Sequence, residues 1–216
     1  MVWAYVGTAV GLGCLAAWWL GRRRYRRHDD VLQRSLSPWW IPAVTGLGAI
    51  LASPFFAGQP AVVIVTYLLA LVWAAMLAFI DLDVRRLPDR LVLPAYAAVA
   101  ALLTGCSAVT GNWEALLRAA ACAGIAVVIF LVAALISPDA QGLGLGDVKL
   151  AGVLGALLGW LSWLTAAMGL LSGFILGGFL ALMLLLARRV DRKSTISFGP
   201  AMLLGAYVWC LLTIPS

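Results

Sequence analysis

Charged residues are scarce in this chain. Only 11% of its 216 residues are Asp, Glu, Lys or Arg, whereas 64% are hydrophobic, and the mean hydropathy is +1.03. A soluble domain is nearer half apolar, so this composition excludes a soluble enzyme or binding module. No stretch is long and polar enough to form a separate soluble domain. We therefore expect one integral membrane domain.

Paired cysteines are missing as well. The four cysteines, Cys14, Cys106, Cys122 and Cys210, all lie inside apolar runs, and none forms a CxxC pair. Structural zinc sites use closely spaced cysteines, so we predict no metal site and interpret these residues as small buried hydrophobic side chains. The first apolar run also lacks an A-x-A-like cleavage site, and basic residues follow it rather than precede it. We therefore expect a retained first span.

Apolar runs of about bilayer length recur along the chain. Eight are evident, at residues 2–20, 39–56, 61–80, 91–109, 116–136, 148–160, 164–187 and 198–214. The second contains Pro42 and Pro54, and the sixth is short. The pattern predicts an all-α fold, a polytopic transmembrane helical bundle of about eight spans. We expect a single domain, 1–216, with a first span and a short basic loop at 1–38 and a helical core at 39–216.

Small residues predict how one of these spans packs. In the seventh run, Gly169, Gly173 and Gly177 recur at every fourth position. This spacing lets two helices approach closely. We expect it to serve packing within the bundle.

The basic residues predict the orientation of the spans. If the spans alternate in direction, the loops at 21–38, 81–90, 137–149 and 188–193 lie on one side, and they hold fourteen of the fifteen Lys and Arg residues. Only Arg118 lies on the other side. Because basic loops stay in the cytoplasm, we expect a multi-pass plasma membrane protein with both termini outside. The net charge of +6 is then a topology signal, so we expect no nucleic-acid partner, and the loop at 21–38 is expected to contact anionic lipid headgroups of the bilayer.

Two aspartates at span ends are the candidate catalytic residues. Asp81 follows the third apolar run, and Asp147 follows the glycines Gly142, Gly144 and Gly146. The predicted topology puts both carboxylates at the cytoplasmic face. A carboxylate at a membrane edge is costly to retain, which marks it as a functional candidate. Glycine permits close backbone approach, so this loop can hold Asp147 beside Asp81 and leave room for an extended substrate.

Two neighbouring carboxylates can hydrolyse a peptide bond. One must be ionised to activate water, and the other must be protonated to polarise the scissile carbonyl. Close approach of like charges produces this split, and the pair then titrates as a unit. The competing interpretation is structural, with Asp147 as a helix cap and Asp81 as a solvated flank. We expect that structural role for Asp83 and Asp89, as caps, flanks or salt-bridge partners of Arg85, Arg86 and Arg90.

Three segments of the chain resemble the type IV prepilin peptidases, the bacterial leader peptidases of pilin-like proteins, and their archaeal preflagellin relatives. They are FIDLDVRRLPDRLVLP from Phe79, GLGLGDVKLAGVLGALLGW from Gly142 and SFGPA from Ser197. Their order and spacing match too, over roughly residues 40–215. The resemblance implies a GxGD membrane aspartyl protease whose catalytic pair is Asp81 and Asp147. It also implies a supporting role for the loop glycines and the following lysine, Gly144, Gly146 and Lys149.

The resemblance further implies a substrate and a location. The substrate would be a pilin-like precursor with a short basic leader, a small residue before the scissile bond and then a hydrophobic helix, cleaved on the cytoplasmic side of a prokaryotic inner membrane. Many bacterial members carry a large loop after the first span, often with paired CxxC motifs that bind zinc, and that region is associated with N-methylation. Here the loop at 21–38 is short and has no cysteine. We therefore expect peptidase activity without a zinc site or cofactor, and not N-methyltransferase activity.

Three other interpretations stay open at this point. A presenilin-type intramembrane protease also uses GxGD but pairs it with Tyr-Asp, whereas Ile80 precedes Asp81 here, and Pro200-Ala-Met only partly matches its Pro-Ala-Leu element. A carboxylate-coupled transporter predicts polar residues in mid-span and repeat symmetry, whereas the spans here are nearly free of charge and no repeat is evident. For a non-enzymatic scaffold the GxGD match would be accidental. The sequence does not predict the oligomeric state.

Overall fold

The chain folds into helices throughout the part that can be described. The computed structural model describes residues 2–23, 25–26, 37–136, 144–186 and 198–213. In these ranges there is no strand, which confirms the all-α fold. The elements are α1 (Val2–Gly21), the 3₁₀ helix η1 (Pro38–Trp40), α2 (Ile41–Leu51), α3 (Ser53–Phe56), α4 (Ala61–Val84), α5 (Asp89–Thr110), α6 (Trp113–Ile136), α7 (Leu145–Leu161), α8 (Trp163–Leu186) and α9 (Gly199–Leu212).

Five of these helices are long and apolar enough to cross a membrane: α1, α4, α5, α6 and the Trp163–Leu180 part of α8. The segment Pro38–Leu51 and α9 are shorter apolar helices, and α7 has 17 residues. Each of the eight predicted runs corresponds to helical structure. A polytopic helical bundle is therefore confirmed, whereas the number of about eight spans stays a prediction.

The second apolar run is the one that departs from a single helix. It forms η1, α2 and α3 in succession. Pro42 lies in the first turn of α2 and Pro54 in the first turn of α3. Proline is tolerated there because its missing N–H would have no helical partner, whereas inside a continuous helix it would break the ladder.

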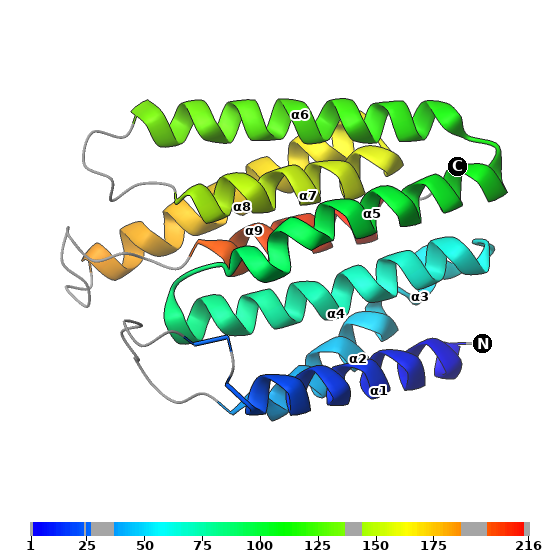
Figure 1. Cartoon of the computed structure of the whole chain (residues 1–216), viewed down its shortest axis with the longest axis horizontal. Helices are drawn as coiled ribbons and strands as arrows, with labels where there is room; N and C mark the ends of the chain where they lie inside the picture. The colour runs from blue at the N-terminus through cyan, green and yellow to red at the C-terminus, as the bar shows by residue number, and fades with distance from the viewer. Residues whose placement is uncertain (1, 24, 27–36, 137–143, 187–197, 214–216) are drawn as a thin grey trace.

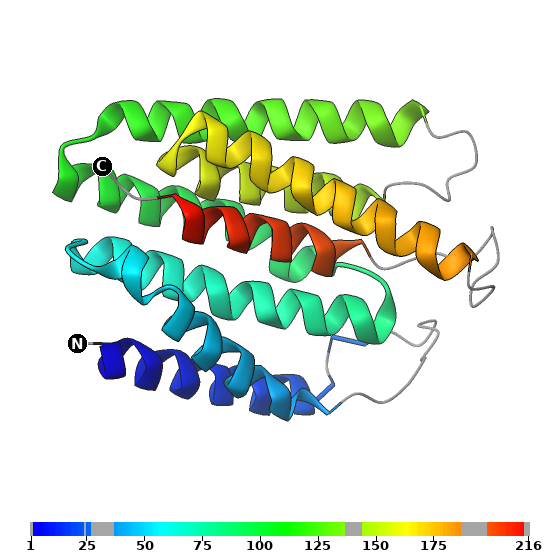
Figure 2. The ribbon, with the colours of Figure 1, turned by 180° about the vertical axis from the view of Figure 1, so that it is seen from behind.

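The long helices lie side by side along the length of the molecule (Figure 1). Helix α7 packs against α5, α6, α8 and α9, and its buried residues follow one another almost without a gap from Val148 to Trp160. A helix that is apolar all round is a core helix. The C-terminal end of α4 and the N-terminal ends of α7 and α9 meet at one end of the bundle, whereas α1 begins and α9 ends at the other (Figure 2).

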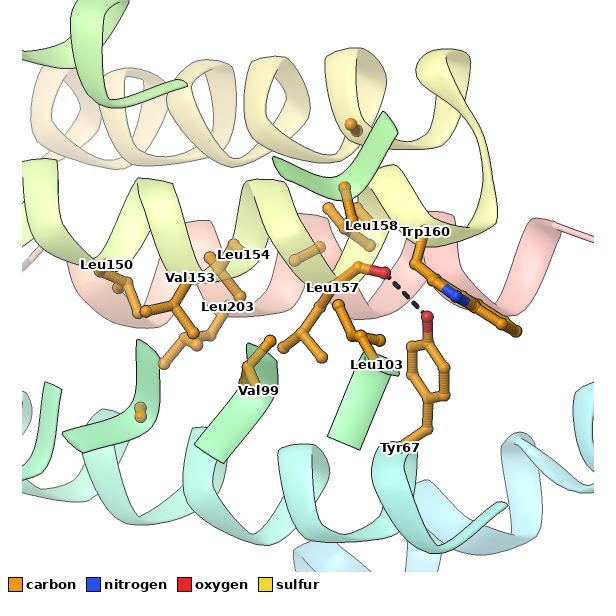
Figure 3. Close-up of a cluster of buried hydrophobic side chains, with 14 of the residues drawn as sticks. Tyr67, Val99, Leu103, Leu150, Val153, Leu154, Leu157, Leu158, Trp160 and Leu203 are labelled. Atoms are coloured by element: carbon orange, nitrogen blue, oxygen red, sulfur yellow. Dashed lines mark hydrogen bonds between the residues drawn. The ribbon is translucent and has the colours of Figure 1, made fainter. Parts of the chain in front are cut away.

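The core around α7 is apolar and contains few polar groups. Figure 3 shows Leu157 of α7 beside Val99 and Leu103 of α5, and all of these side chains are buried. The hydroxyl of Tyr67, from α4, donates a 2.8 Å hydrogen bond to the carbonyl oxygen of Leu157. A buried tyrosine hydroxyl needs such a partner, and here the bond ties α4 to α7.

The predicted close approach in the seventh run is confirmed. Helix α8 packs against α9, and a Cβ added at Gly173 would lie 2.6 Å from the Cα of Met202. A Cβ at Gly177 would meet the ring of Phe198, also next to α9. The glycines therefore serve packing within the bundle, as small residues do in membrane helices.

Candidate active site

Asp81 lies in the helical end of α4 rather than at the start of a loop. The helix continues to Val84 and ends where Arg85 adopts the left-handed conformation, with φ 49° and ψ 38°. The N–H of Arg85 donates to the carbonyl oxygen of Asp81 and closes this last turn, at 2.9 Å. Asp81 is only 4% exposed. A regular helix, not an irregular loop, therefore sets the position of this carboxylate.

Gly199, the first residue of α9, contacts the Asp81 carboxylate directly. Its N–H donates a 3.0 Å hydrogen bond to Oδ2 of Asp81. The first amides of a helix have no partner within the helix, and they carry the positive end of the helix dipole. A Cβ added at Gly199 would lie 2.7 Å from the same oxygen. Only glycine therefore lets α9 approach the carboxylate this closely.

The contact with Gly199 was not predicted from the sequence. The segment around it, Phe198-Gly199-Pro200, served only as a supporting element of the family resemblance. The one local signal is a glycine directly before a proline, since proline favours the first turn of a helix and so predicts a helix start at this point. That signal does not say which side chain faces the free amide.

Asp147 is the third residue of α7. This helix begins at Leu145, so Gly146 and Asp147 are helical rather than part of a loop, while Gly142 lies outside the described residues. Oδ2 of Asp147 accepts a 3.1 Å hydrogen bond from the N–H of Gly144, and the N–H of Asp147 donates to the Gly144 carbonyl oxygen at 2.9 Å. This reciprocal pair caps the helix. Asp147 therefore caps α7 from the third helical position, whereas the N-cap residue is Gly144 and not Asp147 as the structural interpretation expected. Its second carboxylate oxygen is left for other contacts.

The two carboxylates interact electrostatically. Asp147 precedes the apolar run at 148–160, at the end of the bundle where α4 also ends. Burial, and after it the negative charge of Asp81, raises the pKa of the Asp147 carboxyl from 3.8 to about 6, while the hydrogen bond from Gly144 acts in the opposite direction. A carboxylate responds in this way when a like charge is near. The fold therefore brings the predicted pair together; we call Asp81 and Asp147 the dyad.

Gly146 and Lys149 fix the first turns of α7 against α5 and the turn before it. A Cβ added at Gly146 would lie 3.2 Å from Cβ of Leu87, so the glycine permits a close approach. The Nζ of Lys149 lies 2.7 Å from Oδ1 of Asp89, with 35% and 53% of the two side chains exposed. The Tyr96 hydroxyl donates to the carbonyl oxygen of Lys149 at 2.8 Å. An exposed ion pair contributes little stability by itself, so these contacts matter mainly because they set where the first turns of α7 lie against α5.

The expectation for the neighbouring aspartates holds for Asp89 and fails for Asp83. Asp89 is an exposed flank at the start of α5, as expected, and its ion-pair partner is Lys149. Asp83 is not a solvated flank: it is 1% exposed and pairs with Arg26, at 2.7 Å. This pair could not be predicted from the sequence, because the two residues lie far apart along the chain.

Among the described residues, no group of three or more His, Cys, Asp or Glu side chains is placed to hold a metal ion. The four cysteines are free, and none of them is classed as exposed. Cys106 and Cys122 are buried, as expected, whereas Cys14 and Cys210 are only partly buried. The absence of a metal from the working protein stays a prediction.

Comparison with known proteins identifies the family. The family model described as "Type IV leader peptidase family" matches residues 68–214. The prepilin leader peptidase/N-methyltransferase of Aeromonas hydrophila is 34% identical over 146 residues, which cover 65% of this chain and 47% of that protein. The protein of the same name from Aeromonas salmonicida strain A449 is 33% identical over 143 residues, with 65% and 47% covered.

The chain thus spans about half the length of the curated relatives that it matches, and no solved structure matches it significantly. The family match contains both carboxylates of the dyad and the Gly199 amide that contacts one of them. Because it also extends over more than half of the chain, the protein belongs to the type IV leader peptidase family.

Proposed function

We propose that the protein is a membrane-embedded aspartyl endopeptidase that removes the short N-terminal leader of pilin-like precursors at the cytoplasmic face of the membrane. The observation that carries this proposal is the dyad: Asp81, buried on the amide of Gly199, lies close enough to Asp147 to raise its pKa. Membership of a leader peptidase family and the printed names of the relatives support the same substrate class.

The surroundings of the two carboxylates suggest how they divide the work. The N–H of Gly199 at the positive end of α9 stabilises the ionised form of Asp81. Burial and the charge of Asp81 raise the pKa of Asp147 to about 6, so Asp147 can hold the shared proton close to neutral pH. We therefore assign the base role to Asp81 and the acid role to Asp147, within a pair that titrates as a unit.

Peptide hydrolysis then proceeds in two steps. Asp81 takes a proton from water as the water oxygen attacks the scissile carbonyl carbon, and Asp147 gives its proton to the developing oxyanion. In the second step Asp81 returns its proton to the leaving nitrogen while the C–N bond breaks, and Asp147 recovers a proton from the tetrahedral intermediate. The products are a free carboxyl and an amine, and the dyad is restored.

The position of the dyad at one end of the bundle suits a substrate with a leader and an apolar helix. The apolar helix can stay in lipid while the extended leader enters the site. The described basic residues after α1, after α4 and at the start of α5 flank this same end, which supports a cytoplasmic site by the positive-inside rule; they are Arg22, Arg23, Arg26, Arg85, Arg86 and Arg90. We propose peptidase activity alone, because the loop at 21–38 lacks the paired cysteines that the family resemblance associates with N-methylation.

The other interpretations receive less support. The family match favours leader peptidase over a presenilin-type protease. A transporter would need carboxylates along a path through the spans, whereas both carboxylates of the dyad lie at one end of the bundle.

The proposal is tested by incubating the purified protein in detergent with a pilin-like precursor. We expect cleavage by the wild type, loss of at least about a hundredfold in rate for Asp81→Asn and Asp147→Asn, and near-normal cleavage by Asp89→Asn. The last variant removes a carboxylate from the same end of the bundle but only breaks an exposed ion pair. Membrane insertion of each variant is checked in parallel. Substantial cleavage by either dyad variant, once inserted, would contradict the assignment.

A further inference from the structure

The segment that follows α1 returns to the end of α4 and binds Asp83. The hydroxyl of Tyr25 donates to Oδ2 of Asp83 at 2.6 Å. The guanidinium of Arg26 donates twice, from Nε to Oδ2 at 2.8 Å and from Nη2 to Oδ1 at 2.7 Å. Tyr25, Arg26 and Asp83 form a buried cluster that we call the Asp83 clamp.

The clamp keeps a buried carboxylate neutralised. The Arg26 and Asp83 side chains are only 13% and 1% exposed, and an unpaired charge at such a position would be strongly destabilising. Burial, followed by the hydrogen bond to Asp83, raises the pKa of the Tyr25 hydroxyl to about 12, so it stays a neutral donor. The hydrogen bonds from Arg26 to Asp83 raise the pKa of the Arg26 guanidinium, which therefore stays charged.

The clamp lies beside the dyad. Asp83 follows Asp81 by two residues on α4, so its side chain projects about 200° further round the same helix. One face of the last turns of α4 therefore binds Gly199 of α9, and the opposite face binds the segment after α1. Tyr25 and Arg26 lie outside the family match, which begins at residue 68, whereas Asp83 lies inside it.

We propose that Tyr25 and Arg26 are positioning residues for the dyad: they hold the last turns of α4 in place and cancel the charge of Asp83, so that Asp81 and Asp147 share a proton without a third negative charge beside them. This inference rests on the proposed function. Charge balance is the part with the clearest physical consequence, since an added carboxylate charge would make the dyad bind protons more tightly.

The direction of the effect follows from the charges present. Hydrogen bonds place Tyr25 and Arg26 against Asp83, and Asp81 lies two residues before it on the same helix. Arg86, in the turn after α4, is a further positive group at this cluster and donates a 3.5 Å hydrogen bond to the carbonyl oxygen of Tyr25. Relative to the wild type, removal of Arg26 takes one positive charge away from beside the dyad, and removal of Asp83 takes one negative charge away.

The test is the pH profile of precursor cleavage in a set of charge variants. We expect Arg26→Gln to move the whole profile to higher pH by about 0.5–1 unit and Asp83→Asn to move it to lower pH by a similar amount. The double variant should return close to the wild-type profile. Arg26→Lys, which keeps the charge, should leave the profile in place. Arg22→Gln is the matched control, because Arg22 is exposed and stacks on Trp18 rather than on Asp83.

A merely structural clamp gives a different result. The variants would then lose rate at every pH without a shift, and the double variant would be no better than Arg26→Gln alone. Either outcome would overturn the charge-balance role. If Arg26→Gln fails to fold, Arg26→Lys keeps the test decisive. This variant keeps the positive charge, so a shift of its pH profile away from that of the wild type would also overturn the charge-balance role.

Hydrogen exchange tests the holding role without any cleavage assay. Amides of residues 82–86 should exchange several-fold faster in Tyr25→Phe and Arg26→Gln than in the wild type or in Arg22→Gln. Equal exchange in all four proteins would overturn the clamp. If the wild type cleaves no pilin-like precursor, the proposed function fails, and this measurement still decides whether the clamp holds α4.

Discussion

At the scale of single residues, Asp81 and Asp147 have unlike surroundings. Asp81 receives an amide at the start of α9, whereas Asp147 is a helix-capping residue whose pKa is raised by burial and by Asp81. The sequence predicts these two carboxylates as the candidate pair, because the GxGD context of Asp147 is specific and a carboxylate at a membrane edge is costly to retain. It did not predict Gly199 or Arg26 as neighbours, because those contacts depend on how distant helices pack.

The raised pKa of Asp147 predicts a pH-dependent stability. A carboxyl whose pKa is 3.8 when unfolded and about 6 when folded holds its proton more tightly in the native state, so stability falls as pH rises through this interval. Asp147→Asn removes that titration and can still accept the Gly144 hydrogen bond. We expect the variant to be more stable than the wild type at about pH 8, by roughly 1–2 kcal/mol after solvent screening, and nearly equal at about pH 4.

Thermal unfolding in detergent at the two pH values measures this difference. Comparison of the variant with the wild type at each pH cancels the titration of the carboxylates that do not interact with Asp147. An equal stability difference at both pH values would contradict the prediction.

At the scale of elements, the apolar runs predicted the helices well and their ends poorly. Helix α4 extends past the predicted run because its last turn closes on Arg85, and the second run breaks because of its two prolines.

Arg118, the one basic residue on the other side of the predicted topology, caps α7: its guanidinium donates to the carbonyl oxygens of Gly159, Trp160 and Leu161 at 2.7, 2.6 and 3.1 Å. The C-terminal end of a helix carries the negative end of its dipole, so a cation such as the Arg118 guanidinium is favoured there.

The contact between α8 and α9 predicts a contrast between two glycines of one helix. Gly173 is buried, and a Cβ there would lie 2.6 Å from the backbone of Met202, whereas a Cβ at Gly178 would meet nothing within 4 Å. We expect Gly173→Ala to destabilise the protein by about 1–3 kcal/mol through overpacking. Gly178→Ala should be neutral or stabilising by up to about 1 kcal/mol, because alanine favours helix. Unfolding in detergent measures both, and equal effects would contradict this account of the packing.

At the scale of the whole molecule, the alternation of basic and neutral loops predicted which segments share an end. The ends of α4, α7 and α9 that carry Asp81, Asp147 and Gly199 do lie together, as that alternation requires (Figure 2). The orientation of this end toward the cytoplasm stays a prediction, because it depends on the membrane and the insertion machinery rather than on packing. The number of spans depends on the bilayer for the same reason.

Cysteine labelling tests that orientation in intact cells. Asn112 is exposed in the turn between α5 and α6, and Arg90 is exposed at the opposite end of α5. With the four native cysteines replaced by alanine, Asn112→Cys should react with a membrane-impermeant maleimide from outside, and Arg90→Cys only after the membrane is permeabilised. The reverse pattern would place the dyad outside the cell and contradict the proposed site of cleavage.

The central claim is that Asp81 and Asp147 act as one unit. The most direct test is the cleavage rate of a pilin-like precursor by Asp81→Asn, by Asp147→Asn and by the double variant. Groups that act as a unit show strongly non-additive losses, so we expect all three proteins to fall to the same residual rate. A double variant slower than either single variant by the product of their separate losses would show that the two carboxylates act independently, and would contradict the dyad.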